Sequence, residues 1–194
     1  ETMLHNGPPH SSNEGYAYAK RMLEVHSRMY NEQYGDNFIC VIPTNIYGEH
    51  DNYSLENGHV IPALIHQCYL AKKENRPFIV KGTGSPLRQF IYSKDLAELM
   101  MWSLLEYNKW DNVILSVGEN DEISIKDVAI AISKAFEYED NIMFDTQYSD
   151  GQYKKTADNS LLMKYKSDFK FTEFSEGIKK SVDWFKNNYI NCRK

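Results

Sequence analysis

Short apolar runs alternate with amphipathic helical segments along most of the 194 residues, and this alternation restricts the fold more than any other feature. The run FICVIP (38–43) has no charged or strongly polar position, which predicts a strand buried on both faces. Strands of this kind belong to parallel sheets, where a helix usually connects one strand to the next. The sequence therefore predicts an α/β protein with a partly parallel sheet.

The expected elements follow from hydrophobic periodicity and from Gly, Pro and capping residues. The predicted helices are 13–34, ended by Gly35; 59–73, with Pro62 in its first turn; 93–107, capped by Ser93; 122–136, capped by Ser124 with Asp127 at the capping-box position; and 174–189. The predicted strands are 38–43, 112–118, 141–146 and a strand–turn–strand unit over 77–92. Polar loops are expected at 44–58 and 149–160.

Composition limits the classes of partner. A net charge of −5 gives no overall attraction for nucleic acid. No apolar stretch approaches the roughly 18 residues of a membrane span. The three cysteines form no Cys-x-x-Cys pair, which is typical of reduced thiols in a cytoplasmic protein, and we predict no metal site.

The first residues, ETMLHNGPPH, resemble no signal peptide and do not begin with Met, so we expect a piece of a longer chain. No Gly-x-Gly-x-x-Gly turn follows a strand. If a dinucleotide is bound, its phosphate-binding turn is therefore expected outside these residues.

Tyr16 and Lys20 are four residues apart, which places them one above the other on a helix. An ammonium beside a phenol stabilises the phenolate, and the phenol can then exchange a proton with a carbonyl or alcohol oxygen while hydride moves. The spacing alone is not specific, because Tyr69 and Lys73 repeat it. Tyr16, however, begins a helix that leads into a buried strand, whereas Tyr69 ends a helix and is expected at the surface.

Five segments occur in an order that resembles one family: GYAYAKRM, VIPTNIYGEHDNYSLENGHVIPALIH, GTGSPLRQFIYSKDLA, LSVGENDEISIKDVA and SDGQYKKTADNS. The chain is similar, over nearly its whole length, to the carboxyl-terminal part of the GDP-L-fucose synthase family. These proteins are extended short-chain dehydrogenases/reductases. The resemblance implies an NADPH-dependent homodimer that converts GDP-4-keto-6-deoxy-D-mannose to GDP-L-fucose, by 3,5-epimerisation and then 4-keto reduction.

The resemblance also implies a division of the chain. Residues 1–58 would end a Rossmann-type NADP-binding domain, and 59–194 would form mainly a smaller α/β substrate domain. Segments within about 89–118 would return to the Rossmann-type domain.

Catalytic and cofactor roles are implied by the resemblance too. Tyr16 would be the catalytic acid, and Lys20 its partner, which also binds the nicotinamide ribose. His59 would be an acid/base in both epimerisations and lie near the cofactor, whereas His66 is expected to be structural. The nicotinamide pocket would be lined by Pro43, Thr44, Asn45 and Ile46, where a strand ends.

Substrate contacts would come from Gln67, Lys81, Arg88 and Asp150. Arg88 would bind the diphosphate, because a guanidinium fork matches phosphate oxygens, and Asp150 would contact the nucleotide portion. The family often has Trp at the position of Lys81 and, in some members, a basic residue at that of Gln67, so these contacts differ here. Lys154 and Lys155 are further candidates for phosphate attraction.

Taken without the family, the same residues keep simpler interpretations: His59 as a helix cap or surface residue, Arg88 as a surface ion pair and Asp150 as an ordinary turn. The family's catalytic Ser and reactive Cys match no residue here, and Cys40, Cys68 and Cys192 do not correspond to that Cys. We therefore expect the 194 residues alone to be inactive. The alternatives are another nucleotide-sugar epimerase or dehydratase of the same superfamily, or a non-catalytic dimerisation or nucleotide-sugar-binding module.

Overall fold

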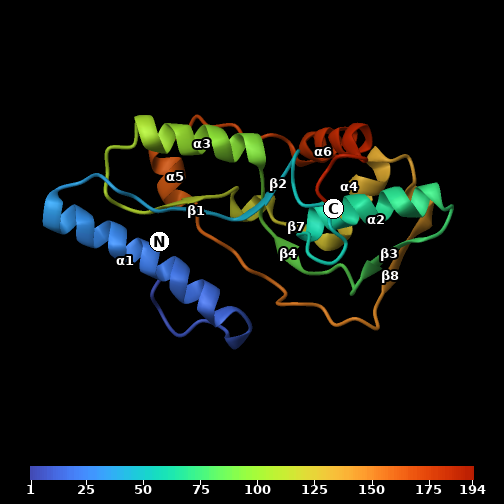
Figure 1. Ribbon diagram of the computed structural model, residues 1–194, viewed down its shortest axis with the longest axis horizontal. Helices are drawn as coiled ribbons and strands as arrows, with labels where there is room; N and C mark the ends of the chain where they lie inside the picture. Colours follow the sequence, from blue (N-terminus) through green and yellow to red (C-terminus); the bar gives the residue numbers. More distant parts are fainter.

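A computed structural model describes residues 1–194, with helices and strands alternating along the chain (Figure 1). The helices are α1 (Glu14–Tyr34), α2 (Val60–Lys73), α3 (Ser93–Leu105), α4 (Ile125–Ala135), α5 (Ser160–Tyr165) and α6 (Phe174–Asn188). The strands are β1 (Val41–Pro43), β2 (Asn45–Tyr47), β3 (Phe78–Lys81), β4 (Leu87–Arg88), β5 (Phe90–Tyr92), β6 (Val113–Leu115), β7 (Ile123–Ser124) and β8 (Ile142–Asp145). None of the helices combines the length and apolar character that a membrane span requires.

The strands form pairs rather than one continuous sheet. β1 pairs with β6, β2 with β5 and β3 with β8, all parallel, and β4 pairs with β7 in the antiparallel sense. The predicted α/β class with parallel strands is confirmed.

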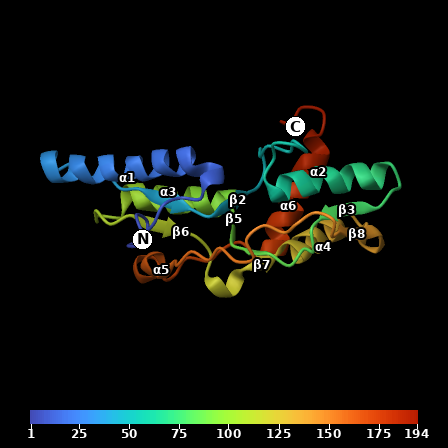
Figure 2. The same ribbon diagram turned by 90° about the horizontal axis from the view of Figure 1, so that it is seen from below.

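Two hydrophobic cores lie at opposite ends of an elongated molecule (Figures 1 and 2). The larger core joins α2, α4 and α6 to β3, and includes Phe78, Ile132 and Phe185. The smaller core joins α3, β6 and α5 around Leu99, Leu115 and Leu162. Residues 90–115 therefore lie beside β1 and β2, at the end of the molecule that carries α1, while the domain boundaries themselves stay a prediction.

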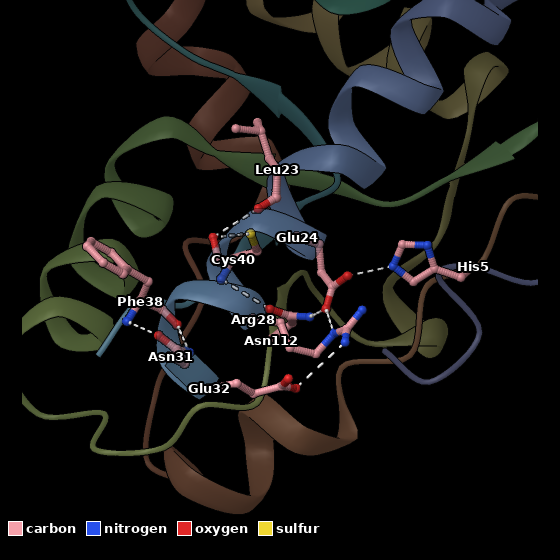
Figure 3. A network of polar contacts seen from close by, with 10 residues as sticks. His5, Leu23, Glu24, Arg28, Asn31, Glu32, Phe38, Cys40 and Asn112 are labelled. Atoms are coloured by element: carbon pink, nitrogen blue, oxygen red, sulfur yellow. Dashed lines mark hydrogen bonds and ion pairs between the residues drawn. The ribbon is translucent and has the colours of Figure 1, made fainter. Parts of the chain in front are cut away.

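Helix α1 is held to the rest of the chain by polar side chains (Figure 3). The Glu24 carboxylate is buried and contacts His5 Nε2 at 2.6 Å, Asn112 Nδ2 at 3.2 Å and Arg28 Nε at 3.4 Å. Burial acts to raise the pKa of Glu24, but these partners outweigh it and hold the pKa below its ordinary value. The apolar positions of this helix, in contrast, are exposed: Tyr16, Met22, Leu23 and Tyr30.

The helix predictions are confirmed apart from end residues, and Pro62 lies in the first turn of α2 as expected. The predicted cap at Ser124 is confirmed, because its Oγ accepts a hydrogen bond from the Asp127 backbone N–H at 3.0 Å. The predicted cap at Ser93 is wrong. Tyr92 is the N-cap residue and makes no side-chain cap, while the Ser93 Oγ lies against Gly48.

Three further predictions differ from the structure. FICVIP forms a strand only over its last three residues and is half-buried, because β1 has a partner on one side only. The loop expected at 44–58 contains β2, which pairs with β5. Tyr69 is not a surface residue: its ring packs on Phe185 and Tyr189, at centroid distances of 5.5 and 4.4 Å. Helix α5 was not predicted.

Candidate active site

The carboxyl ends of β1 and β2 open into a cavity of about 530 Å³, here called the first cavity. Tyr16 from the start of α1, Asn45 from β2 and His59 from the start of α2 all line it. The Tyr16 side chain is 66% exposed, so its hydroxyl is open to a ligand rather than consumed by packing. Lys20 lies one turn further along α1, with its Nζ 5.6 Å from the Tyr16 ring centroid, and does not line the cavity.

The segment from Pro43 to Ile46 forms one wall of the first cavity. Asn45 Nδ2 donates to the backbone oxygen of Gln89 at 2.8 Å, and Thr44 Oγ1 donates to Ser116 Oγ at 3.0 Å. Gln89 is completely buried and donates in turn to two backbone carbonyls. Because these bonds are made to buried groups, the wall is held in one position, with apolar surface from Pro43 and Ile46 exposed.

His59 is the N-cap residue of α2, but its side chain makes no capping hydrogen bond and is exposed. Of the two simpler interpretations, a capping side chain is therefore wrong, whereas a surface residue agrees with the structure. Asp51 lines the same cavity. Burial raises the pKa of Asp51 above its ordinary value. A hydrogen bond from the Asn52 backbone N–H and the nearby His59 and Arg193 side chains act to lower this pKa, but burial outweighs them. The cavity thus contains an imidazole, a carboxyl and a phenol.

Tyr53 anchors the loop that carries Asp51. Its side chain is completely buried, and its hydroxyl donates to the Gly48 carbonyl at 3.1 Å. Its backbone N–H donates to the Arg193 carbonyl at 2.8 Å, and its own carbonyl accepts from His66 Nδ1 at 2.8 Å. His66 is buried, in agreement with the structural role expected for it.

Glu49 is a cavity residue that the sequence analysis missed. Its carboxylate accepts hydrogen bonds from Tyr92 Oη at 2.6 Å and from Lys94 Nζ at 2.9 Å. Burial acts to raise the pKa of Glu49, but these two donors outweigh it and lower the pKa. The only available signal was the unusual length of the polar loop, which does not indicate which of its side chains matter.

A second cavity, of about 520 Å³, contains all four residues expected to contact a substrate: Gln67, Lys81, Arg88 and Asp150. Val60 and Arg88 line both cavities, so the two are neighbours. Leu64, Val80 and Ile125 supply apolar lining.

Three of these four residues, Arg88, Asp150 and Lys81, have a partner within the protein. The Arg88 guanidinium donates to the backbone oxygens of Leu87 at 2.6 Å and Gln152 at 2.8 Å. The Asp150 carboxylate accepts from the backbone N–H and the hydroxyl of Thr83. Lys81 Nζ lies 4.7 Å from the centroid of the Tyr148 ring.

Lys154 does not serve the second cavity. Its ammonium pairs with Glu122 at 3.2 Å and also with Glu119, and these hydrogen bonds raise the pKa of Lys154. Lys155 is exposed and lines neither cavity. Nor does the chain bring together three or more His, Cys, Asp or Glu side chains in an arrangement that could hold a metal ion.

Several known proteins are similar to this chain over most of its length. The model of the NAD dependent epimerase/dehydratase family matches residues 1–118. A GDP-L-fucose synthase of Dictyostelium discoideum is 58% identical over 194 residues, covering 100% of this chain and 61% of the relative. A probable GDP-L-fucose synthase of Drosophila melanogaster is 48% identical, covering 100% and 63%. A crystal structure of a GDP-L-fucose synthetase from Naegleria fowleri bound to NADP superposes with a TM-score of 0.95 at 46% identity, covering 98% of this chain and 58% of that one.

The chain belongs to the NAD dependent epimerase/dehydratase family. The resemblance to GDP-L-fucose synthases that the sequence predicts is confirmed, and the chain spans about three fifths of the length of these relatives.

Proposed function

We propose that these residues form the substrate side of an NADPH-dependent GDP-L-fucose synthase, which epimerises GDP-4-keto-6-deoxy-D-mannose at C3 and C5 and then reduces its 4-keto group. The observation that carries the proposal is the junction of the two cavities at Val60 and Arg88. On one side of this junction lie a phenol and an imidazole, on the other lie Lys81 and Asp150, and Arg88 lines both cavities. A nucleotide-sugar has the matching shape, with a reactive sugar at one end and a charged diphosphate and base at the other.

The first cavity suits the nicotinamide end of NADP(H). Pro43 and Ile46 offer apolar surface to a flat ring, at the carboxyl ends of parallel strands, where ligands of α/β proteins bind. Lys20 would bind the ribose, and Thr44, Asn45 and His59 would complete the pocket. When bound, the cofactor supplies hydride to C4 of the sugar.

Tyr16 would donate its hydroxyl proton to the C4 oxygen as that oxygen gains negative charge. The exposed hydroxyl is free to approach a substrate, and the Lys20 ammonium lies on the same face of the helix. A cation brought beside the phenol oxygen in the complex with substrate would stabilise the phenolate that remains after transfer. The proton lost from Tyr16 is then replaced from solvent.

His59 would act at C5 and C3, whose hydrogens are acidic because they are next to the 4-keto group. An imidazole is suited to this step, because it both accepts and donates protons near neutral pH. Its side chain makes no cap with α2 and is therefore available. The second acid/base of each epimerisation would be supplied by a residue outside these 194.

The remaining parts of the proposal concern the whole protein. The 194 residues alone would not bind NADPH tightly, because no Gly-rich phosphate-binding turn follows a strand in them. The complete enzyme would be a cytoplasmic homodimer. The three free cysteines support a cytoplasmic location, where thiols stay reduced. The exposed apolar face of α1 supports a dimer, because a second chain could cover it.

The test uses the complete protein with NADPH and GDP-4-keto-6-deoxy-D-mannose. Tyr16→Phe should lower kcat for reduction by about 10² to 10⁴, the usual contribution of a positioned acid, without loss of GDP-sugar binding. Tyr18→Phe is the matched control, because Tyr18 is also exposed on α1 but does not line the first cavity.

His59→Gln should slow exchange of the C3 and C5 hydrogens with deuterated solvent and leave hydride transfer less affected. If Tyr16→Phe reduces the GDP-sugar at the normal rate, Tyr16 is not the proton donor. Turnover of a different nucleotide-sugar in preference to the GDP-sugar would instead support another enzyme of the superfamily.

A further inference from the structure

Two segments far apart in the sequence meet at the edge of the second cavity. The turn between β3 and β4 (82–86) lies against residues 148–151, which follow β8. Asp150 Oδ1 accepts the Thr83 backbone N–H at 2.9 Å, and Asp150 Oδ2 accepts from Thr83 Oγ1 at 2.6 Å. Thr83 therefore binds both oxygens of the carboxylate and fixes its rotation.

Gly82 makes this close approach possible. Its φ of +87° is a conformation that favours glycine, and a Cβ at this position would lie 2.4 Å from Asp150 Oδ1. The Thr83 hydroxyl is itself held in place, because Thr83 Oγ1 accepts from the Ser85 backbone N–H at 3.1 Å. The turn is thus shaped around the Asp150 carboxylate.

The carboxylate keeps capacity for a ligand. An ionised carboxylate accepts about four hydrogen bonds, and Thr83 supplies two of them. Asp150 lines the second cavity, whereas Thr83 does not. The remaining lone pairs of Asp150 are therefore available to N–H or O–H donors of a molecule bound there.

A separate set of bonds holds the backbone beyond Asp150. The Arg88 guanidinium donates to the Gln152 carbonyl at 2.8 Å, and the Leu87 backbone N–H donates to the Tyr153 carbonyl at 2.8 Å. Loss of the Thr83 hydroxyl should consequently leave the Asp150 carboxylate held by the Thr83 backbone N–H alone, without releasing the segment that carries it.

We propose that Thr83 is a positioning residue for nucleotide binding: it orients the Asp150 carboxylate toward the second cavity, where that carboxylate accepts from the nucleotide part of the substrate. This inference rests on the proposed function, because it takes the ligand of this cavity to be a GDP-sugar. Thr83 acts through Asp150 and does not itself touch the ligand.

The experiment measures GDP binding to the complete protein by isothermal titration calorimetry. Thr83→Val keeps the side-chain shape and removes the hydroxyl, and should weaken GDP binding by about tenfold, as expected for a lost hydrogen bond to a charged group. Thr83→Ser restores the hydroxyl and should bind GDP like the unmodified protein. Thr156→Val is the matched control, because it removes a hydroxyl that donates to the Glu122 carboxylate at 2.6 Å and lines neither cavity, and it should also bind GDP normally.

A double substitution separates positioning from a general structural effect. In an Asp150→Ala background, Thr83→Val should cause no further loss of GDP affinity, because the carboxylate on which it acts is gone. In kinetics, Thr83→Val should raise KM for the GDP-sugar by about tenfold and leave KM for NADPH unchanged, since the cofactor lies in the first cavity.

The outcomes are distinguishable. If the unmodified protein does not bind GDP, the proposed function of the second cavity fails, and this inference fails with it. If the unmodified protein binds GDP and Thr83→Val binds equally well, only the role of Thr83 is overturned. A loss that persists in full in the Asp150→Ala background would also overturn it, because Thr83 would then act independently of Asp150.

Discussion

The buried histidine of α2 should make the stability of the protein depend on pH below neutrality. His66 is 7% exposed, and its Nδ1 donates to the Tyr53 carbonyl, which holds the loop beside the first cavity. Burial lowers the pKa of His66 from its ordinary value, and the charge of Lys194 acts in the same direction. The hydrogen bond to Tyr53 opposes both and is outweighed.

The sign of the effect follows from where the proton binds. Above pH about 6.5, His66 is neutral in the folded and the unfolded chain, and its full contribution to stability is present. Below that pH the unfolded chain takes up a proton that the folded chain does not. Stability should then fall by up to about 1.4 kcal/mol per pH unit, until the lower folded-state pKa is reached.

His66→Gln removes this titration. It should also lower the free energy of unfolding at pH 7.5 by roughly 1–2 kcal/mol, through the weakened bond to Tyr53 and the lost ring contacts with Phe185 and Tyr189. Urea unfolding followed by tryptophan fluorescence at pH 7.5, 6.5 and 5.5 measures both effects.

The difference between the two proteins isolates His66, because the other titrating groups, such as Glu24, Glu49 and Asp51, are common to both. This difference should shrink as the pH falls from 6.5 to 5.5. Parallel pH profiles over that range would refute the reasoning, since they would mean that His66 titrates alike in the folded and unfolded states.

Two other substitutions test how helices are held. Ser124→Ala removes the cap of α4 and should lower the free energy of unfolding by about 1 kcal/mol. Ser124→Gly should lower it by only a few tenths of a kcal/mol. Thermal unfolding would detect the effect of Ser124→Ala as a fall in Tm of about 2–4 °C. Glu24→Ala removes the buried carboxylate that anchors α1 and should cost roughly 1–3 kcal/mol locally, seen as faster hydrogen exchange of α1 amides. Unchanged exchange in α1 would show that this helix is held by other contacts.

The hydrogen bond of a capping side chain was predictable from the sequence only where no distant segment contacts that side chain. Ser93 and Ser124 both precede a predicted helix with an Asp in its first turn, although Asp95 is two residues after Ser93 and Asp127 is three residues after Ser124, at the capping-box position. Only Ser124 caps its helix, because the Ser93 side chain faces Gly48, which lies 45 residues earlier in the chain. The helices themselves were found because their apolar periodicity extends over many residues.

The residues of the candidate site also fall into two groups: some are neighbours in the sequence, and others are far apart in it. Pro43 to Ile46 are consecutive and follow a recognisable strand, so the nicotinamide pocket that the resemblance implies there agrees with the rule that ligands of α/β proteins bind where parallel strands end. The four residues of the second cavity are spread from 67 to 150, and only the family resemblance brought them together. Glu49 and Thr83 were missed because their partners, Tyr92 and Asp150, are 43 and 67 residues away in the sequence.

In the proposed function, Arg88 would connect ligand binding to the wall of the site. Its guanidinium has five N–H groups, and the carbonyls of Leu87, Gln152 and Tyr153 accept three of them. The other two stay available for the oxygens of a diphosphate, so the same planar group can hold residues 152–153 and a ligand together. A lysine could not do both, because its single ammonium lacks a second, separately directed nitrogen. Thr83 and Arg88 therefore hold the segment 150–153 from both ends, and in the proposed function the position of Asp150 and the binding of phosphate would depend on one shared surface.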